Sequence, residues 1–201
     1  PSSEGFANQD GNTAQELYND DIFVGYRYYD TFGVDVSYPF GYGGSYTSFA
    51  MSTKSVKADK DKVTVQVKVK NTGTVSGKEV AEVYFSAPDG ELDKPYQELA
   101  GYAKTDELAP GESQILTISF DTKEMGSYDT DKAAYVMEDG DYIIRVGNSS
   151  RNTHVAAKLN VAEDTITEQY SNLMVPVTEN DNIENSDKYP TLEPMTTEEI
   201  G

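Results

Sequence analysis

The stretch KVTVQVKVK, residues 62–70, alternates strictly between polar residues and valine. A β-strand places successive side chains on opposite faces, so a period of two puts the four valines on one face and the lysine, threonine and glutamine side chains on the other. Branching at Cβ also favours extended backbone. The stretch therefore predicts a strand with one buried and one solvated face, which is typical of an antiparallel sheet.

The same alternation recurs downstream, with turn residues such as Asn71, Gly73, Pro110 and Gly140 between the runs. The further strong runs are EVAEVYF (79–85), QILTISF (114–120), DYIIRVG (141–147) and HVAAKLNV (154–161). The last run is expected to turn Val155, Ala157, Leu159 and Val161 to one face. Weaker patterns cover residues 48–58 and 97–104. Together they predict an all-β, antiparallel β-sandwich of about seven strands.

The composition divides the chain into three parts. Residues 1–45 are first polar and then rich in glycine and aromatic residues, and residues 46–162 hold the strand patterns. Residues 163–201 contain ten acidic residues and a single basic one, Lys188. We therefore predict a sandwich over 46–162 between irregular N- and C-terminal extensions, the second being an acidic linker or tail.

Charge and residue usage exclude several classes of function. The net charge of −19 argues against nucleic acid, whose phosphates require a basic surface. No stretch approaches the roughly 20 apolar residues of a membrane span, so no membrane contact is predicted within this chain. The absence of cysteine excludes disulfides and thiolate metal sites.

No catalytic constellation stands out. His154 is the only histidine, and its place at the start of a predicted strand indicates a surface residue. With neither a second histidine nor a cysteine, no transition-metal site is expected. Acidic residues are plentiful, but those near the aromatic run, such as Asp30 and Asp35, are read as turn and solvation residues. We predict no catalytic residue, no metal ligand and no cofactor.

Residues 21–46, DIFVGYRYYDTFGVDVSYPFGYGGSY, hold nine of the 22 aromatic residues, and we call them the aromatic segment. Five glycines and Pro39 interrupt it, which argues against a regular helix. Three roles are compatible with it: docking on another domain, stacking on sugar rings, and local packing. Docking fits best, because aromatic side chains dominate buried interfaces. The candidate docking residues are Phe23, Tyr26, Arg27, Tyr28, Tyr29, Phe40 and Tyr42.

Several of these segments resemble glycoside hydrolase family 3. The aromatic segment is similar to the family pattern E-[DG]-I-[FY]-V-G-Y-R-Y-[YF]-D followed by Y-P-F-G-Y-G-L-S-Y-T-x-F, with Gly44 where the family usually has leucine. Residues 63–88, 94–113 and 139–150 resemble strands and loops of the family's third domain, including the block KP-x-[KQ]-x-L-x-G-[FY]-x-K. The resemblance extends from about Asp20 to about Val161.

The resemblance implies that the chain is a C-terminal fragment of a β-glucosidase-like enzyme. The sandwich would be its fibronectin type III-like, immunoglobulin-like domain, and residues 1–45 would be a linker and the incomplete end of the preceding α/β-sandwich domain. In the family, a barrel domain carries the nucleophilic Asp and the second domain usually carries the acid/base Glu. Neither motif is present here, so the fragment is expected to be inactive, while the parent is expected to be a retaining β-glycosidase.

Two functional hypotheses follow. The first is a non-catalytic accessory domain that docks on the barrel and α/β-sandwich domains of its parent and shapes the substrate entrance through Lys94, Pro95, Tyr96 and Gln97. The second is a stand-alone carbohydrate-binding or cell-surface adhesive module. A complete small hydrolase is poorly supported. The sequence slightly favours an extracellular or cell-envelope location over the bacterial cytoplasm.

Overall fold

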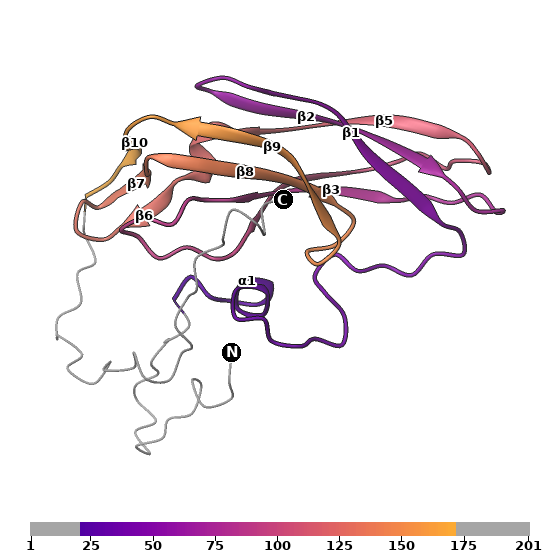
Figure 1. Ribbon diagram of the computed structural model, residues 1–201, viewed down its shortest axis with the longest axis horizontal. Helices are drawn as coiled ribbons and strands as arrows, with labels where there is room; N and C mark the ends of the chain where they lie inside the picture. Colours follow the sequence, from indigo (N-terminus) through magenta and orange to yellow (C-terminus); the bar gives the residue numbers. More distant parts are fainter. Residues whose placement is uncertain (1–20, 172–201) are drawn as a thin grey trace, which may run out of the picture.

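The computed structural model describes residues 21–171, which form a two-layered β-sandwich (Figure 1). One layer is a three-stranded sheet in the order β1 (Phe49–Ala58), β2 (Lys62–Asn71) and β5 (Ser113–Asp121). The other is a four-stranded sheet in the order β4 (Glu98–Lys104), β3 (Val80–Ser86), β8 (Gly140–Gly147) and β9 (Thr153–Val161). All pairings are antiparallel, which confirms the predicted seven-strand sandwich.

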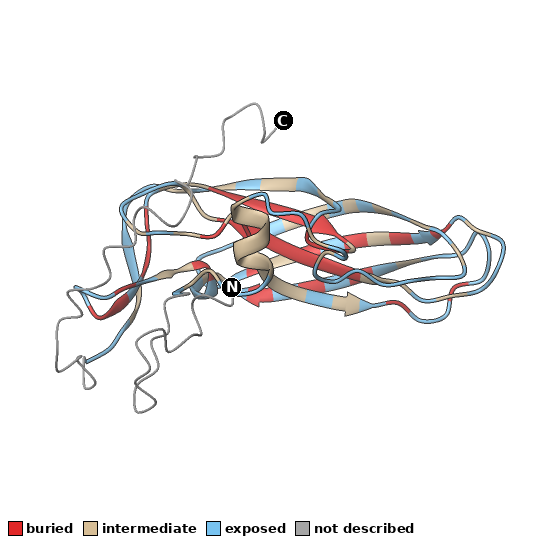
Figure 2. Cartoon of the chain, turned by 90° about the horizontal axis from the view of Figure 1, so that it is seen from below, coloured by how far each residue is buried: buried red, intermediate tan, exposed pale blue. Residues whose placement is uncertain are grey.

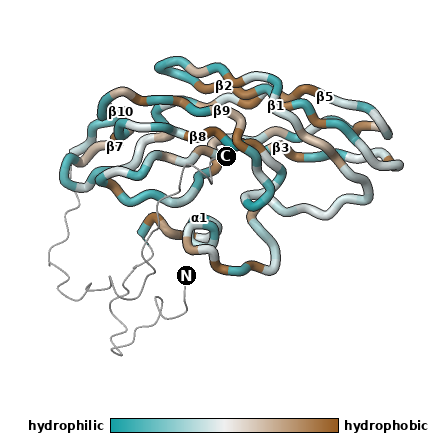
Figure 3. The backbone as a smooth tube through the Cα atoms, in the orientation of Figure 1, coloured by the Kyte–Doolittle hydropathy of each residue, from teal (hydrophilic) through white to brown (hydrophobic). Residues whose placement is uncertain are grey.

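The core lies between the two layers. Val63, Val65, Val67 and Val69 of β2 are fully buried, as the alternation predicts, and Figure 3 shows the change of hydropathy along this strand. Burying a valine side chain contributes about 2 kcal/mol, so β2 alone supplies a large part of the favourable free energy. The core also includes side chains of β3, β5 and β8, namely Ala81, Val83, Phe85, Leu116, Ile118, Phe120, Tyr142, Ile144 and Val146.

One predicted core position is wrong. In β9 the register against β8 shifts, so that Ala157 pairs with Ile144 while Val155 pairs with Arg145. The extra residue, Ala156, is a β-bulge that breaks the alternation. Val155 is consequently exposed, whereas Ala157, Leu159 and Val161 pack against the core.

Three further short strands were not predicted. They form a small sheet in the order β10 (Thr165–Gln169), β7 (Ala134–Met137) and β6 (Ser127–Asp129), next to the 3₁₀-helix η1 (Thr122–Met125). β10 lies within residues 163–201, the stretch predicted to be an acidic linker or tail. Its residues 165–169 form a strand that pairs with β7. Residues 1–20 and 172–201 lie outside the described residues, so the predictions for them stay predictions.

The aromatic segment contains a helix, contrary to the expectation from its glycine content. α1 (Tyr26–Thr31) is six residues long and lies beyond the four-stranded sheet, on the side away from β1, β2 and β5 (Figure 1). Gly25 and Gly33 flank it, and both have a φ of 61°. Between residues 21 and 171, no helix is long and apolar enough to cross a membrane.

Candidate functional site on the covered face of the four-stranded sheet

The two central strands of the four-stranded sheet are buried on both faces. In β2, buried residues alternate with exposed or half-buried ones. In β3, by contrast, every residue from Ala81 to Ser86 is buried, and in β8 every residue from Tyr142 to Gly147. One face of each strand meets the core. The other is covered by the aromatic segment and by the loop between β3 and β4, as the view onto α1 shows (Figure 2).

Glycines set both ends of α1. Gly25 precedes the helix with a φ of 61° and a ψ of −132°, a conformation that few other residues tolerate. At the other end Gly33 is left-handed, and the N–H of Val34 donates to the carbonyl of Tyr29 at 2.9 Å. This is a Schellman ending, which satisfies a terminal carbonyl and turns the chain sharply. The glycines therefore bound the helix instead of preventing it.

Tyr26 fastens the helix to the edge of the sheet. Its hydroxyl oxygen accepts a hydrogen bond from the backbone N–H of Leu99 in β4, with 2.8 Å between the two atoms. Its ring stacks on Phe40 with 4.6 Å between centroids and meets Tyr84 of β3 edge-on at 6.2 Å. One residue thus connects the helix, the edge strand and the later part of the aromatic segment.

Polar side chains add contacts on both sides of Tyr26. Arg27 forms an ion pair with Glu98 of β4 at 3.3 Å. The hydroxyl of Thr31 accepts a hydrogen bond from the N–H of Tyr96 at 2.8 Å, which joins the helix to the β3–β4 loop. The helix is therefore held along its whole length by this chain's own sandwich.

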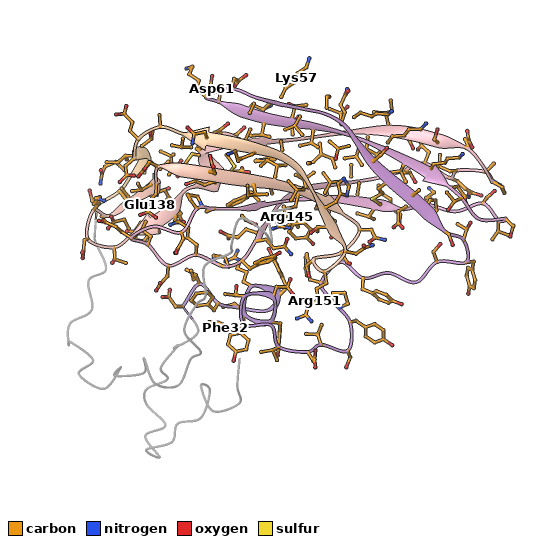
Figure 4. All side chains as sticks on the ribbon, viewed as in Figure 1. Phe32, Lys57, Asp61, Glu138, Arg145 and Arg151 are labelled. Carbon is orange, nitrogen blue, oxygen red and sulfur yellow. The ribbon has the colours of Figure 1, made fainter. Side chains whose placement is uncertain are left out.

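Arg151 holds the end of the helix. Its Nε donates to Asp30 Oδ1 at 2.8 Å and its Nη2 donates to the carbonyl of Tyr29 at 3.0 Å. A guanidinium group suits this position, because it presents several donors in one plane and favours the negative end of a helix. Figure 4 shows Arg151 beside α1 and Arg145 between α1 and the sheet.

The segment after the helix comes close to the sheet at Gly41. The carbonyl of Phe40 accepts a hydrogen bond from the N–H of Ser150 at 2.8 Å. Gly41 has a φ of 80°, and a Cβ atom there would lie 2.3 Å from the carboxylate oxygens of Glu82. Only glycine allows this approach.

Glu82 and Tyr84 form a buried polar pair under this contact. The Tyr84 hydroxyl donates to Glu82 Oε2 at 2.6 Å, and both residues are buried. Burial raises the pKa of the Glu82 carboxyl, although the hydrogen bond from Tyr84 opposes that shift. Burial and the neighbouring carboxylate raise the pKa of Tyr84 far above its usual value, so its hydroxyl remains a donor.

The loop between β3 and β4 holds the predicted entrance residues. Lys94 forms a buried ion pair with Glu138, and Glu138 also accepts the N–H of Glu91 at 2.7 Å. Gln97 is buried and donates to the carbonyl of Ser150. Pro95 is buried as well, while the ring of the half-buried Tyr96 lies 5.0 Å from the guanidinium carbon of Arg145.

The outer side of the aromatic segment remains exposed. Tyr38 and Tyr42 are 71% and 57% exposed, and their rings contact each other with 5.0 Å between centroids. Beside them lies a shallow depression lined by Pro39, Tyr42, Gly43, Asn148, Ser149, Arg151 and Asn152. The segment therefore presents an aromatic surface while its inner side is fastened to the sheet.

The predicted docking residues divide between these two sides. Tyr26 and Arg27 contact the sheet, whereas Phe40 and Tyr42 are exposed, Phe40 also stacking on Tyr26. The other three predicted docking residues are half-buried and form an aromatic cluster with Phe32. They are Phe23, Tyr28 and Tyr29.

Sequence reasoning missed the contact of Asp30 with Arg151, and with it the partners of the aromatic segment, namely Glu82, Tyr84, Ser150 and Arg151. One signal could have found the covered face. The runs VYF (83–85) and YIIRVG (142–147) do not alternate cleanly, and a strand buried on both faces loses its alternation.

The described residues show no metal-binding group. From residue 21 to residue 171, no cluster of three or more histidine and acidic side chains could hold an ion. His154 lies in β9, exposed, with Nε2 3.0 Å from the Thr53 hydroxyl of β1. It therefore joins the edges of the two sheets.

Comparison with known proteins identifies the family. A model of the fibronectin type III-like domain matches residues 79–150. A β-glucosidase of Ruminococcus albus is 42% identical over 184 residues, which cover 89% of this chain and 19% of that protein. β-Glucosidase A of Butyrivibrio fibrisolvens is 40% identical over 199 residues, which cover 88% of this chain and 24% of that protein.

Solved structures show the same relationship. A β-glucosidase from Paenibacillus barengoltzii superposes with a TM-score of 0.78 at 44% identity, covering 85% of this chain and 20% of that one. A GH3 β-glucosidase from Bifidobacterium adolescentis gives 0.65 at 34% identity, covering 73% and 22%. The chain thus spans about a fifth of the length of the relatives it matches. It belongs to glycoside hydrolase family 3 and contains the fibronectin type III-like accessory domain.

Proposed function

We propose that this chain docks on the catalytic domains of a β-glucosidase-like hydrolase through its aromatic segment. The observation that carries the proposal is the two-sided segment: Tyr26 and Asp30 fasten it to the sandwich, while Tyr38 and Tyr42 face outward. A rigid base beneath exposed aromatic side chains limits the entropy lost on association. The relatives, about five times longer, supply the catalytic domains that this surface would contact.

The β3–β4 loop is proposed to shape the substrate entrance of the whole enzyme. Lys94 and Gln97 would act by holding the loop in place, because Lys94 is paired with Glu138 and Gln97 with Ser150. The exposed side chains of this loop are acidic ones, Asp89, Glu91 and Asp93. The loop would therefore shape the entrance through its fixed conformation and through these carboxylates.

A second candidate function is carbohydrate binding by the sandwich itself. The observation that favours it is the depression beside Tyr42, where an aromatic ring stands next to the side chains of Asn148 and Asn152. Rings that stack and amides that donate and accept hydrogen bonds suit a neutral sugar. The same surface cannot serve both roles at once, since docking would cover Tyr42.

Calorimetric titration separates the two functions. The first titrant is the Ruminococcus albus β-glucosidase from which the matching segment has been deleted, and the second is cellohexaose. Docking predicts that the chain binds the deleted enzyme and that Tyr42→Ala weakens binding at least tenfold. The matched control is Ile115→Ala, an exposed apolar residue on the other sheet. Binding to cellohexaose alone, lost in Tyr42→Ala, would favour the carbohydrate module.

A further inference from the structure

The outer face of the three-stranded sheet is basic, although the protein is strongly acidic. We call Lys57, Lys62, Lys68 and Lys70 the lysine face. The alternation that buries the valines of β2 turns its lysines outward, and Lys57 of β1 joins them because it pairs with Thr64. Lys57, Lys62 and Lys70 are exposed and Lys68 is half-buried. Figure 4 shows Lys57 projecting on the side of the molecule opposite α1.

The positive charge of this region contrasts with the negative charge of the whole chain. Residues 54–70 contain six lysines and two aspartates, a net charge of +4 in a chain of net charge −19. The two aspartates already have contacts: Asp59 accepts hydrogen bonds from the N–H groups of Asp61 and Lys62, and Asp61 pairs with Lys60. The exposed Asp121 of β5 stands opposite Lys62 in the register and is the one acidic residue in the three strands of this sheet. Within the part of the chain that the structure describes, no ion pair involves a lysine of the lysine face.

A matching acidic segment belongs to the same chain. Residues 172–201 contain seven acidic residues and Lys188, a net charge of −6. They follow β10, where Glu168 pairs with Lys123 of η1. The neighbouring Thr122 contacts the β1–β2 turn, its N–H donating to the carbonyl of Asp61 at 3.0 Å. β10, the last described strand, therefore lies toward the same end of the molecule as the β1–β2 turn (Figure 1).

We propose that residues 172–201 bind to the lysine face of their own chain. Thirty residues can span up to about 100 Å, so the whole face lies within reach. Attachment to the same chain raises the effective concentration of the acidic segment to about the millimolar range, which individually weak, exposed ion pairs require. Because such pairs are screened, the contact weakens as salt rises. This proposal does not depend on docking through the aromatic segment.

Zero-length cross-linking tests the contact in the full chain. A carbodiimide joins a carboxylate to an amine only where the two groups meet, and mass spectrometry identifies the joined peptides. We expect Lys57 and Lys70 to couple to carboxylates between Glu179 and Glu199 at 20 mM salt. At 500 mM salt the yield of this coupling should be at least fivefold lower. The exposed pair of Lys158 and Asp141, 2.8 Å apart, is the positive control.

Two charge-reversed variants complete the test. Lys62→Glu with Lys68→Glu should reduce coupling of the remaining Lys57 and Lys70 to the acidic segment at least fivefold. Lys78→Glu with Lys104→Glu changes the charge equally outside the lysine face and should leave that coupling within twofold. Equal coupling of the acidic segment to Lys78 and Lys104 in the unmodified chain would overturn the proposal. Coupling only between isotope-labelled and unlabelled copies would overturn it too, and would assign the face to a second copy.

Discussion

At the scale of single residues, a few side chains and one glycine fix the aromatic segment to the sheet. Gly41 allows the backbone to pass over Glu82, and the Glu82 carboxylate accepts a hydrogen bond from the hydroxyl of the buried Tyr84. Buried polar groups of this kind stabilise a structure only when they are paired, and an unpaired one costs free energy. The stability of this face therefore depends on a small number of contacts that substitutions can remove one at a time.

Replacing Gly41 by alanine should destabilise the protein by about 1–3 kcal/mol. The left-handed backbone penalises any side chain, and the new Cβ would collide with the Glu82 carboxylate. Gly43 is the matched control, because no atom would lie within 4 Å of a Cβ there and its φ is not positive. Urea unfolding measures both variants. Equal stability of Gly41→Ala and Gly43→Ala would show that the segment does not approach the sheet at Gly41.

Glu82 should make stability fall as pH rises above about 4.5. Its pKa is raised in the folded state, so its contribution is fully present below the unfolded value and is lost as pH rises through the folded value. In Glu82→Gln the Tyr84 hydroxyl keeps an acceptor but the titration is absent. The variant should therefore gain stability relative to the parent chain between pH 4.5 and 7.

The control for this pH profile is Glu107→Gln, which replaces an exposed carboxyl. This variant shows how far the loss of one exposed charge alone changes the profile. Taking differences between chains cancels the groups they share, among them Glu98, whose burial also raises its pKa. A flat difference for Glu82→Gln would mean that this carboxyl is solvated in the folded protein.

At the scale of elements, the strands were predictable and the helix was not. Strict alternation located β2 and β5 because an antiparallel strand with one solvated face imposes a period of two. α1 was missed because glycines were counted as helix breakers, whereas Gly25 and Gly33 stand at its two ends. The bulge at Ala156 leaves no local signal, since HVAAKLNV alternates equally well in either register.

The side-chain contacts between elements that are distant in the sequence could not be predicted either. Arg151 lies more than a hundred positions from Asp30, and nothing in the local pattern of either residue indicates the other. The small sheet was missed because β6 and β7 are only three and four residues long, too short for a periodic pattern. The resemblance to family 3 located the domain but did not indicate which side of the aromatic segment faces the sheet.

Removing the hydroxyl of Tyr26 should loosen the edge of the sheet. In Tyr26→Phe the N–H of Leu99 loses its acceptor, at a cost of about 1 kcal/mol, and its hydrogen exchange should accelerate roughly fivefold. Tyr29→Phe is the matched control, since its ring contacts Tyr28 in the same helix. Hydrogen exchange followed by NMR measures both. Unchanged exchange at Leu99 in Tyr26→Phe would mean that α1 is not bound to β4.

At the scale of the whole molecule, the sandwich has two faces of different character. One carries the aromatic segment, fastened on its inner side and exposed at Tyr38 and Tyr42, and the other carries the lysine face. Exposed aromatic surface on a rigid base is typical of protein interfaces. We therefore propose that this chain acts by contact with the catalytic domains of a family 3 hydrolase.

Hydrolysis of an aryl β-glucoside tests that claim most directly. The Ruminococcus albus β-glucosidase lacking the matching segment is assayed alone, with this chain added, and with the Tyr42→Ala chain added; this chain is also assayed by itself. We predict no hydrolysis by this chain alone, at least tenfold more by the truncated enzyme when the chain is added, and loss of most of that gain with Tyr42→Ala. Hydrolysis by the chain alone, or a truncated enzyme indifferent to its addition, would contradict the account.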